Sequence, residues 1–411
     1  MTSFTFPEKF LWGTATSAHQ VEGNNINCDN WVMEHLPDSP FAEPSGDACD
    51  HYHRFTEDIA LLAKLGFNAY RFSIEWARIE PEEGAFSKAE LEHYRRMLAA
   101  CHENGLTPMV TYHHFTTPRW LLCDGGWLGE KTPDRFARYC ETATKYFGDM
   151  IGAGCTLNEP NLSALLGYIL PFKMNEQPWW QQASEAFDVT PERFGPFLFA
   201  DPKRAHEVIV SSHRKAVDAI KSVGYDFPVG LTLALVDFQC AEGGEEMVKK
   251  IRYETGGNFL HRLEGDDFVG VQTYTRMFIN EEGILPVPEG AEKNQMCEEF
   301  YPQSIGNTVR FAAETSGLPV YVTENGLASE DDTQRVRFYG QAIDSVAVAM
   351  QEDVDVRGYF CWSAFDNFEW VSGYGPKFGI IAVDRETQVR TVKPSAAFVG
   401  SSTRTFSEMA C

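Results

Sequence analysis

The stretches Gly152-Ala-Gly-Cys-Thr-Leu-Asn-Glu-Pro160 and Pro319-Val-Tyr-Val-Thr-Glu-Asn-Gly326 decide the fold of this chain. Each is a short apolar run of the kind that forms a buried β-strand, followed by a carboxylate and then by a Pro or Gly turn. Similar short apolar runs recur along the sequence. They predict eight strands, at Phe10–Thr14, Ala69–Ile74, Thr107–Tyr112, Gly152–Leu157, Val229–Leu235, Phe268–Thr273, Pro319–Thr323 and Gly358–Ser363.

Helical patterns lie between these runs. Ser87 and Glu90 have the spacing of a capping box, and Thr132 with Pro133 predicts a cap followed by the first helical position. Strands that alternate with helices are typical of a parallel sheet. We therefore predict an α/β fold, a single (β/α)8 TIM barrel, with a doubly wound open sheet as the alternative. The predicted helices are His53–Leu65, Ser87–Asn104, Asp134–Phe147, Ala205–Ser222 and Thr333–Gln351.

The chain has 411 residues and no low-complexity tract or Ser/Gly linker that would divide it. A TIM barrel with long loops can reach this length, so we expect residues 1–411 to form one catalytic domain. The longest interval separates the fourth and fifth predicted strands, and its segment 171–202 is rich in Trp, Phe and Pro. We predict that this segment is a loop excursion over one face of the barrel. It is either a wall of the substrate site or a cover for apolar surface.

Charge and cysteine usage disfavour several classes of protein. The formal net charge of −24 predicts a surface that repels nucleic acid and anionic membranes. None of the 10 cysteines forms a CxxC pair, so we expect most of them to be free, buried thiols of a reducing compartment. The first residues lack a signal-peptide pattern, and no apolar run approaches the ~20 residues of a membrane span. We expect a cytoplasmic protein, and the sequence leaves its oligomeric state open.

Polar and ionisable side chains cluster just after the predicted strands. The C-terminal ends of the strands carry the active site in TIM barrels, so these residues are expected in one cavity. His113 and His114 are neighbours on a strand and point to opposite faces, so only one of them can face that cavity. The candidate site residues are Gln20, Arg71, His114, Asn158, Glu159, Tyr274, Glu324, Trp362, Glu369 and Trp370.

Two carboxylates in one cavity can cleave a glycosidic bond. One must be protonated to assist the leaving oxygen, and the other must be ionised to attack the sugar or to activate water. Their environments must therefore differ enough to separate their pKa values. Arg71 is a cation that can keep one of Glu159 and Glu324 ionised, and Asn158 supplies a neutral amide at the same rim.

We expect no metal and no cofactor. His51-Tyr52-His53 has the HxH spacing of some metal-dependent hydrolases, but it precedes a predicted helix instead of ending a strand. The sequence contains no Walker or dinucleotide-binding fingerprint.

Four segments resemble glycoside hydrolase family one, in the order in which that family carries them. Phe10-Leu-Trp-Gly-Thr-Ala-Thr-Ser-Ala-His-Gln-Val-Glu-Gly23 is similar to its N-terminal signature. Thr156-Leu-Asn-Glu-Pro160 resembles its acid/base motif, and Tyr321-Val-Thr-Glu-Asn-Gly326 resembles its nucleophile motif. Trp362-Ser-Ala-Phe-Asp-Asn-Phe-Glu-Trp370 resembles its last strand and loop. The resemblance covers essentially the whole chain.

The resemblance implies a (β/α)8 barrel that hydrolyses small-molecule β-glycosides with retention of configuration. Glu324 would be the nucleophile and Glu159 the acid/base, with Arg71 and Tyr274 beside the nucleophile to keep it ionised. The two carboxyl groups would lie ~5–5.5 Å apart, which suits direct attack.

The resemblance also assigns sugar-binding roles. Gln20 and Glu369 would hold hydroxyls on the far side of the sugar, and Trp370 would add an indole N–H. His114 and Asn158 would bind nearer the reacting carbon, with Asn158 at the 2-hydroxyl. Trp362 would form the stacking floor.

The chain departs from the family pattern at the edge of the site. His19 stands where the family usually has Tyr, and Gln272-Thr273-Tyr274 and His114-Phe115-Thr116-Thr117-Pro118 differ from the usual motifs. Glu369 occupies the place of a Ser in members that act on 6-phosphorylated sugars, and a carboxylate there predicts an unphosphorylated substrate.

Three functions fit these residues. The first is a retaining β-glycosidase, with a β-glucoside as the favoured substrate and β-galactosides and β-fucosides still open. The second is a transglycosylase that uses the same intermediate. The third is a carbohydrate-binding barrel without turnover, which needs no pair of carboxylates with separated pKa values.

Overall fold

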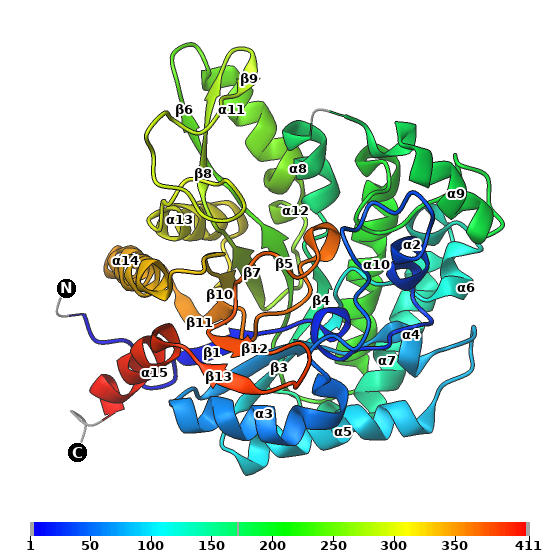
Figure 1. Ribbon diagram of the computed structural model, residues 1–411, viewed down its shortest axis with the longest axis horizontal. Coiled ribbons are helices and arrows are strands. Elements are labelled where there is room, and N and C mark those ends of the chain that lie inside the picture. Colours follow the sequence, from blue (N-terminus) through cyan, green and yellow to red (C-terminus); the bar gives the residue numbers. More distant parts are fainter. Residues whose placement is uncertain (1–3, 171, 408–411) are drawn as a thin grey trace.

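The structure, a computed structural model, describes residues 4–170 and 172–407 (Figure 1). Within these residues, eight parallel strands close into a barrel in the order β1-β11-β10-β7-β5-β4-β3-β2. Because β1 is hydrogen-bonded to both β11 and β2, the sheet has no free edge and the open-sheet alternative is wrong. The strands are β1 Leu11–Ala15, β2 Ala69–Ser73, β3 Thr107–His113, β4 Ala153–Asn158, β5 Val229–Ala234, β7 Phe268–Gln272, β10 Val320–Asn325 and β11 Val356–Trp362. All eight predicted strands are confirmed.

Helices cover the outside of the barrel. The five predicted ones are confirmed, and Ser87 caps α5 by accepting a hydrogen bond from the Glu90 amide. The prediction that Thr132 is a cap is wrong. Thr132 is the first residue of α7, and its hydroxyl donates to the Gly126 carbonyl instead. The covering helices are α3 His51–Leu65, α5 Lys88–Glu103, α7 Thr132–Phe147, α10 Pro202–Ser222, α13 Ser304–Ser316, α14 Asp332–Gln351 and α15 Pro394–Ser407. The helix α11 Glu245–Arg252 lies in a separate lobe.

Smaller elements lie in the loops. The strands β6, β8 and β9 form a separate sheet beyond the ends of β5 and β7, which with α11 makes the lobe at the top of Figure 1. These elements are α1 Ala18–Val21, α2 Asp29–Glu34, α4 Trp76–Ile79, α6 Arg119–Leu122, η1 Gly126–Leu128, η2 Gly148–Met150, α8 Leu162–Ile169, η3 Met174–Glu176, α9 Pro178–Ala186, β6 Asp237–Cys240, η4 Tyr253–Gly257, α12 Asn258–Leu260, β8 Arg276–Asn280, β9 Gly283–Ile284, η5 Trp370–Ser372, β12 Ile381–Val383 and β13 Arg390–Val392.

The strands bury both of their faces. Side chains on one face pack inside the barrel, as Ala69, Met109 and Phe360 do. Side chains on the other face, such as Tyr70 and Val110, pack in the layer between strands and helices. Strands buried on both sides appear in the sequence as continuous apolar runs instead of alternating ones, which is why the runs alone predicted them.

The segment after β4 contains more structure than predicted. The helix α9 and the turn η3 lie within the predicted loop excursion (Figure 1), whose first residue, Pro171, lies outside the described residues. Trp179 and Trp180 are buried, and their rings pack edge-on against Phe199 and Phe194. The excursion therefore has a small aromatic core of its own.

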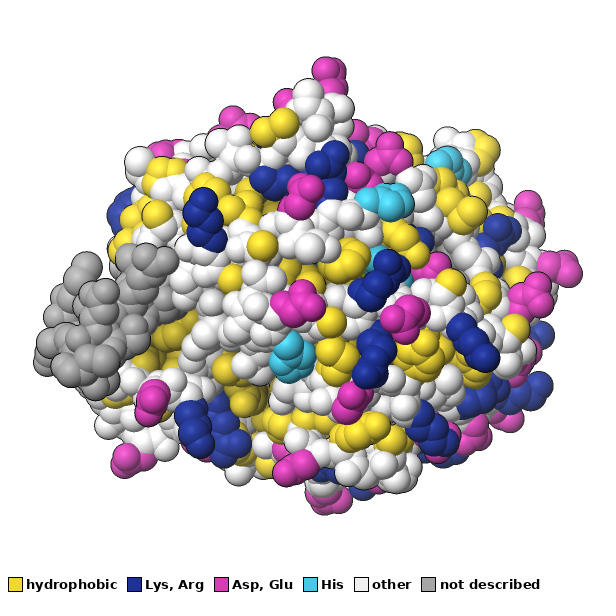
Figure 2. All heavy atoms as spheres, turned by 90° about the horizontal axis from the view of Figure 1, so that it is seen from below, with side chains coloured by type: hydrophobic (Ala, Val, Ile, Leu, Met, Phe, Trp, Pro, Cys, Tyr) yellow, Lys and Arg dark blue, Asp and Glu magenta, His cyan; other side chains and the backbone are white. Residues whose placement is uncertain are grey.

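Cysteine state and surface charge follow the composition. The nine cysteines of the described residues are free thiols, most of them buried, and Cys411 lies outside those residues. Charged side chains of both signs are interspersed on the face that Figure 2 shows. Among the helices of the described chain, none combines the length and apolarity that crossing a bilayer requires.

Gly326 directly follows β10, the strand that carries Glu324. A substitution at this position tests how tightly the C-terminal end of the barrel is packed. A Cβ there would lie 1.8 Å from the Trp362 carbonyl oxygen, so Gly326→Ala must displace backbone. We expect the substitution to lower the free energy of unfolding by about 1–3 kcal/mol or more, measured by urea denaturation.

Gly167 in α8 is the matched control, because a Cβ there would meet nothing within 4 Å. Gly167→Ala should be neutral or stabilising, since Ala favours a helix by about 0.5–1 kcal/mol over Gly. Equal free energies of unfolding for the two variants would contradict this prediction, because they would show that the backbone around Gly326 can move to accept a Cβ at little cost.

Candidate active site

The predicted site residues converge at the C-terminal ends of the strands. Glu159 follows β4, Glu324 is the second-last residue of β10, and Arg71 lies in the middle of β2. Hydrogen bonds and charge interactions connect them with the remaining predicted residues. These contacts test the geometry, while the role of each residue stays a prediction.

The strands β4 and β10, which lead to the two carboxylates, each contain a β-bulge near their C-terminal ends. On β10, Val322 pairs with Val271 but Glu324 already pairs with Gln272, so β10 has one extra residue. On β4 the register against β5 shifts between Cys155 and Asn158. Because side chains alternate along a strand, each extra residue moves the next side chain to the other face. The bulges thus bring Glu324 and Asn158 to the interior side.

The guanidinium of Arg71 connects three strands across the barrel. Its Nη1 donates to Glu324 Oε1 at 2.6 Å, and its Nη2 donates to Asn158 Oδ1 at 2.5 Å. Its Nε donates to Thr111 on the neighbouring strand at 3.1 Å. The Arg71 side chain is fully buried, so these partners must satisfy both its charge and its donors.

Glu324 is surrounded by donors. Tyr274 donates its hydroxyl to Oε2 at 2.6 Å, while Arg71 holds Oε1. Burial raises the pKa of Glu324, but the charge of Arg71 and these two hydrogen bonds act in the opposite direction. The pKa of Glu324 is therefore raised, but the donors around it oppose burial and favour its anion more than the surroundings of Glu159 favour that of Glu159.

Glu159 has a different environment. Its φ of 46° lies in the left-handed region, a strained conformation for a non-glycine residue of the kind found at functional sites. The side chain of Asn161 anchors the turn, because its Nδ2 donates to the Ala234 carbonyl at 2.6 Å. Burial, and then the charge of Glu324, raise the pKa of Glu159 well above its usual range. Glu159 is thus the carboxyl that keeps its proton when Glu324 has lost one.

The amide of Asn158 is held in one orientation. Its Oδ1 accepts from Arg71, from Gln272 Nε2 at 2.9 Å and from Thr232 Oγ1 at 3.1 Å. Its Nδ2 lies 3.1 Å from His114 Nε2. Burial and the charge of Arg71 lower the pKa of His114 well below its usual value, so the imidazole is neutral and Nε2 accepts from Asn158.

Sequence reasoning noted Gln272 only as a departure from the family motif and missed Thr232 as a part of this site. The only signal for Thr232 was a polar residue inside an otherwise apolar strand.

The remaining residues form a wall beside the carboxylates. Gln20 Nε2 donates to the Phe368 carbonyl at 2.7 Å and lies 3.4 Å from Glu369 Oε2. The His114 ring stacks on Trp362 with a centroid distance of 5.8 Å. Burial and the charge of Glu324 raise the pKa of Glu369 to about 8. This wall offers amide and carboxyl groups beside aromatic faces, which suits a polyhydroxylated ring.

The contacts of the two histidine motifs, His113-His114 and His51-Tyr52-His53, show how these side chains are used. His114 faces Asn158, whereas His113 packs between the rings of Trp127 and Phe197, so only His114 faces the site as predicted. His51 pairs with Asp58 at 2.8 Å instead of holding a metal. In the part of the chain that the structure describes, no group of three or more His, Cys, Asp or Glu side chains is arranged to hold a metal.

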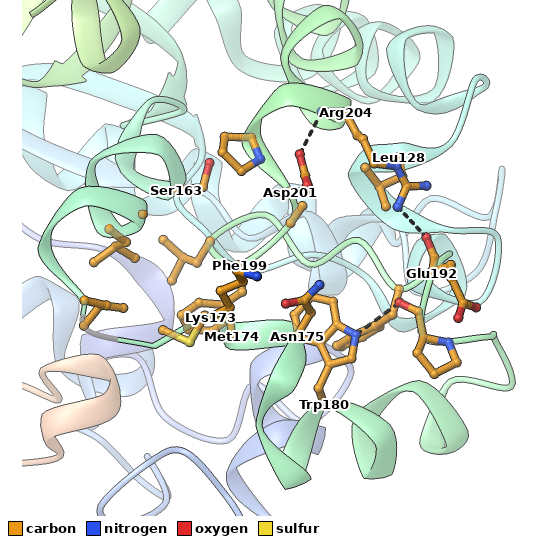
Figure 3. Close-up of a pocket in the computed structure, with 18 of the residues that line it drawn as sticks. Leu128, Ser163, Lys173, Met174, Asn175, Trp180, Glu192, Phe199, Asp201 and Arg204 are labelled. Atoms are coloured by element: carbon orange, nitrogen blue, oxygen red, sulfur yellow. Dashed lines mark hydrogen bonds between the residues drawn. The ribbon is translucent and has the colours of Figure 1, made fainter. Parts of the chain in front are cut away.

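A cavity of about 480 Å³ lies between α8 and the excursion (Figure 3). Leu166 and Gly167 line it from the helix, and Trp180 and Phe199 line it from the excursion. The indole of Trp180 is fixed by a hydrogen bond to the Pro191 carbonyl at 3.1 Å. The cavity lining combines apolar side chains with polar and charged ones such as Asp201 and Arg204. None of the ten predicted site residues lines it.

Known proteins resemble this chain along almost its whole length. β-Glucosidase A of Thermotoga maritima is 32% identical over 95% of this chain and 96% of its own length. The crystal structure of a β-glycosidase, BGL167, has a TM-score of 0.95 at 54% identity and covers 97% of both chains. The Thermotoga maritima β-glucosidase in complex with deoxynojirimycin has a TM-score of 0.86 at 28% identity, over 98% of this chain and 99% of that one.

The sequence also matches the family model of glycosyl hydrolase family 1 over residues 2–252 and 265–405. A match of this extent covers every strand of the barrel and every residue of the candidate site. The chain therefore belongs to glycosyl hydrolase family 1 and is a glycosidase.

Proposed function

We propose that this protein is a retaining exo-β-glycosidase that releases the terminal non-reducing sugar of β-glucosides, with Glu324 as nucleophile and Glu159 as acid/base. The observation that carries the proposal is the unequal environment of the two carboxyls. Arg71 and Tyr274 both donate to Glu324, whereas burial and the neighbouring Glu324 favour the protonated form of Glu159. The relatives named β-glucosidase support the choice of sugar.

In the first step Glu324 attacks the anomeric carbon while Glu159 gives its proton to the glycosidic oxygen. The bond between that carbon and oxygen breaks, and the aglycone leaves as an alcohol. Glu324 becomes the acyl part of a glycosyl ester, and Glu159 is left as a carboxylate. The loss of charge on Glu324 removes a repulsion that raised the pKa of Glu159. That pKa falls, so Glu159 stays ionised and is ready to act as a base in the second step.

In the second step Glu159 takes a proton from a water molecule whose oxygen attacks the anomeric carbon. The ester bond breaks, Glu324 leaves as a carboxylate, and Glu159 regains its proton. Two inversions at one carbon give overall retention of the β-configuration. Arg71 and Tyr274 act as positioning donors for the departing carboxylate of Glu324.

In this proposal the polar side chains beside the two carboxylates bind the hydroxyls of the sugar. Asn158 would hold the 2-hydroxyl, because its amide is already oriented by Arg71 and Gln272. Gln20 and Glu369 would hold hydroxyls remote from the anomeric carbon. The carboxyl of Glu369 supports an unphosphorylated sugar, since neither its neutral nor its ionised form supplies the positive charge that a phosphate group would need as a partner.

We further propose that the chain acts as one catalytic domain in the cytoplasm. Pairing between β1 and β11 supports a single unit, because it joins the two ends of the barrel sequence. The buried free thiols support a reducing compartment.

The cavity beside α8 is proposed to receive the aglycone. The helix begins three residues after Glu159, which protonates the leaving oxygen, so the leaving group emerges near it. The apolar walls of Leu166, Trp180 and Phe199 suit an aryl or alkyl group.

Glu324→Gln keeps the shape of the side chain but cannot form the glycosyl ester. We expect kcat on aryl β-glucosides to fall by at least about 10⁴-fold, measured by release of the aryl alcohol. A 2-deoxy-2-fluoro-β-glucoside should label the parent enzyme on the peptide that contains Glu324. Glu80→Gln is the control, since Glu80 is equally buried and paired with Arg138 outside the site, and it should keep turnover. Substantial turnover by Glu324→Gln would remove Glu324 as the nucleophile.

Glu159→Ala removes the acid/base alone. Substrates with poor leaving groups should lose about 10²–10⁴-fold in kcat/KM, while activated aryl glucosides still form the intermediate. Azide should then restore turnover and yield the β-glycosyl azide.

The pH dependence tests the same assignment. Because Glu159 must be protonated and burial raises its pKa, activity of the parent should persist above the usual carboxyl range and fall as pH rises through that pKa. This alkaline limb should vanish in Glu159→Ala. An α-linked azide product, or an unchanged alkaline limb, would contradict the assignment.

Gly167→Trp tests the aglycone cavity, because open space surrounds this position and an indole there fills it. We expect kcat/KM to fall at least about tenfold for bulky aryl and alkyl β-glucosides and to stay unchanged for methyl β-glucoside. Ile169→Trp, an exposed position of the same helix outside the cavity lining, should change neither. Equal kinetics of the Gly167 and Ile169 variants on bulky substrates would place the aglycone elsewhere.

A further inference from the structure

His19 lies behind the sugar wall and has no role in the proposed chemistry. It precedes Gln20 on α1 and is 1% exposed. Its Nε2 lies 2.6 Å from Glu34 Oε1, and both side chains are fully buried. The second oxygen of Glu34 accepts from the amide and the hydroxyl of Ser45. The imidazole is therefore fixed at one end by a carboxylate that is itself held in place.

The His19 ring also stacks on the indole of Trp370. The two rings are nearly parallel, at 9°, with centroids 5.7 Å apart. The edge of the His19 ring also packs against Phe368, whose carbonyl accepts from Gln20. His19 thus contacts both the residue before Glu369 and the residue after it.

Trp370 depends on its neighbours for its position. Its φ of 50° is a left-handed conformation that a bulky residue adopts only when surrounding contacts enforce it. Besides His19, its ring contacts are His114 at 6.1 Å and Phe115 at 5.0 Å. Loss of the His19 ring would remove one of the flat surfaces that define where the indole lies.

The Glu34 carboxylate favours a proton on Nε2 of His19, the ring nitrogen that faces it. Burial acts to lower the pKa of His19, but the charge and hydrogen bond of Glu34 outweigh it, and the pKa lies above its usual value. The same pairing lowers the pKa of Glu34. On the other side of the ring, Nδ1 of His19 lies 3.2 Å from the amide nitrogen Nδ2 of Asn25 and 3.5 Å from the sulfur of Cys28.

We propose that His19, anchored by Glu34, is a positioning residue of the sugar site whose flat ring sets the indole of Trp370 and the adjoining segment that carries Glu369. It contacts no substrate and acts only through these neighbours and through Gln20 on its own helix. The inference rests on the proposed function, and it adds a determinant of sugar recognition behind the residues that touch the sugar.

His19→Gln tests the proposal. Glutamine can still donate to Glu34 but has no flat ring to support Trp370. The measurement is kcat/KM on an aryl β-glucoside and on its 2-, 3-, 4- and 6-deoxy analogues with one enzyme sample. The ratio between two substrates cancels any loss of folded enzyme, so reduced stability alone cannot change it.

We expect each missing hydroxyl to lower kcat/KM of the parent enzyme, and the penalty is the ratio of kcat/KM for the full glucoside to that for the deoxy analogue. In His19→Gln the penalty should shrink at least about tenfold for one or more of the 3-, 4- and 6-deoxy sugars, because the groups that bind them have moved. The penalty for the 2-deoxy sugar should stay as in the parent, because Asn158 is held from the opposite side by Arg71. His19→Tyr keeps a flat ring and a donor for Glu34, so it should restore the parent pattern.

His213 provides the matched control. It forms a buried pair with Asp266 at 3.0 Å and packs behind β4, away from Trp370. His213→Gln should leave all four penalties unchanged. Unaltered penalties in His19→Gln, an equal change at all four positions, or a loss of discrimination in His19→Tyr would overturn the proposal. Failure of the parent to hydrolyse any β-glucoside would instead overturn the proposed function.

Discussion

The buried guanidinium of Arg71 is the interaction on which the rest of the site depends. An unpaired charge inside a barrel is strongly unfavourable, and an arginine cannot lose its proton to escape that penalty. Arg71 is therefore stable only with Glu324 ionised on one side and the Asn158 carbonyl oxygen on the other. The same contacts that satisfy the arginine prepare the nucleophile and orient the amide. Folding stability and catalytic preorganisation are in this way two consequences of one set of hydrogen bonds.

The division of labour between the carboxyls follows from this asymmetry. Both Glu159 and Glu324 are buried, and burial alone would favour the protonated form of each. Only Glu324 receives a cation and a phenolic hydroxyl, and its negative charge then acts on Glu159 across the cavity. The proton of Glu159 is thus maintained by burial first and by the ionisation of its partner second, so the pair titrates as a unit. Formation of the glycosyl ester switches that influence off when a base is needed.

Features with a local signal could be predicted from the sequence, and features set by strand pairing could not. The strands are apolar runs with clear ends, and the residues at those ends, including Glu159 and Glu324, must meet in a closed parallel barrel. The bulges in β4 and β10 depend on how each strand pairs with its neighbour, and nothing in either run marks the extra residue. The cap at Thr132 failed for a similar reason, because a carbonyl at Gly126 competes for its hydroxyl.

The barrel strands and the loops are therefore constrained by different kinds of contact. Strand residues such as Arg71 and Asn158 are fixed by hydrogen bonds across the barrel, and little can change there without leaving a buried charge or amide unpaired. The loops are held by contacts among themselves. His19 with Glu34 uses a buried ion pair to hold an aromatic ring, and the excursion uses its own aromatic core to shape a cavity. Differences in sugar and aglycone preference can accumulate in these segments without touching the Arg71 network, so one reaction can serve many substrates.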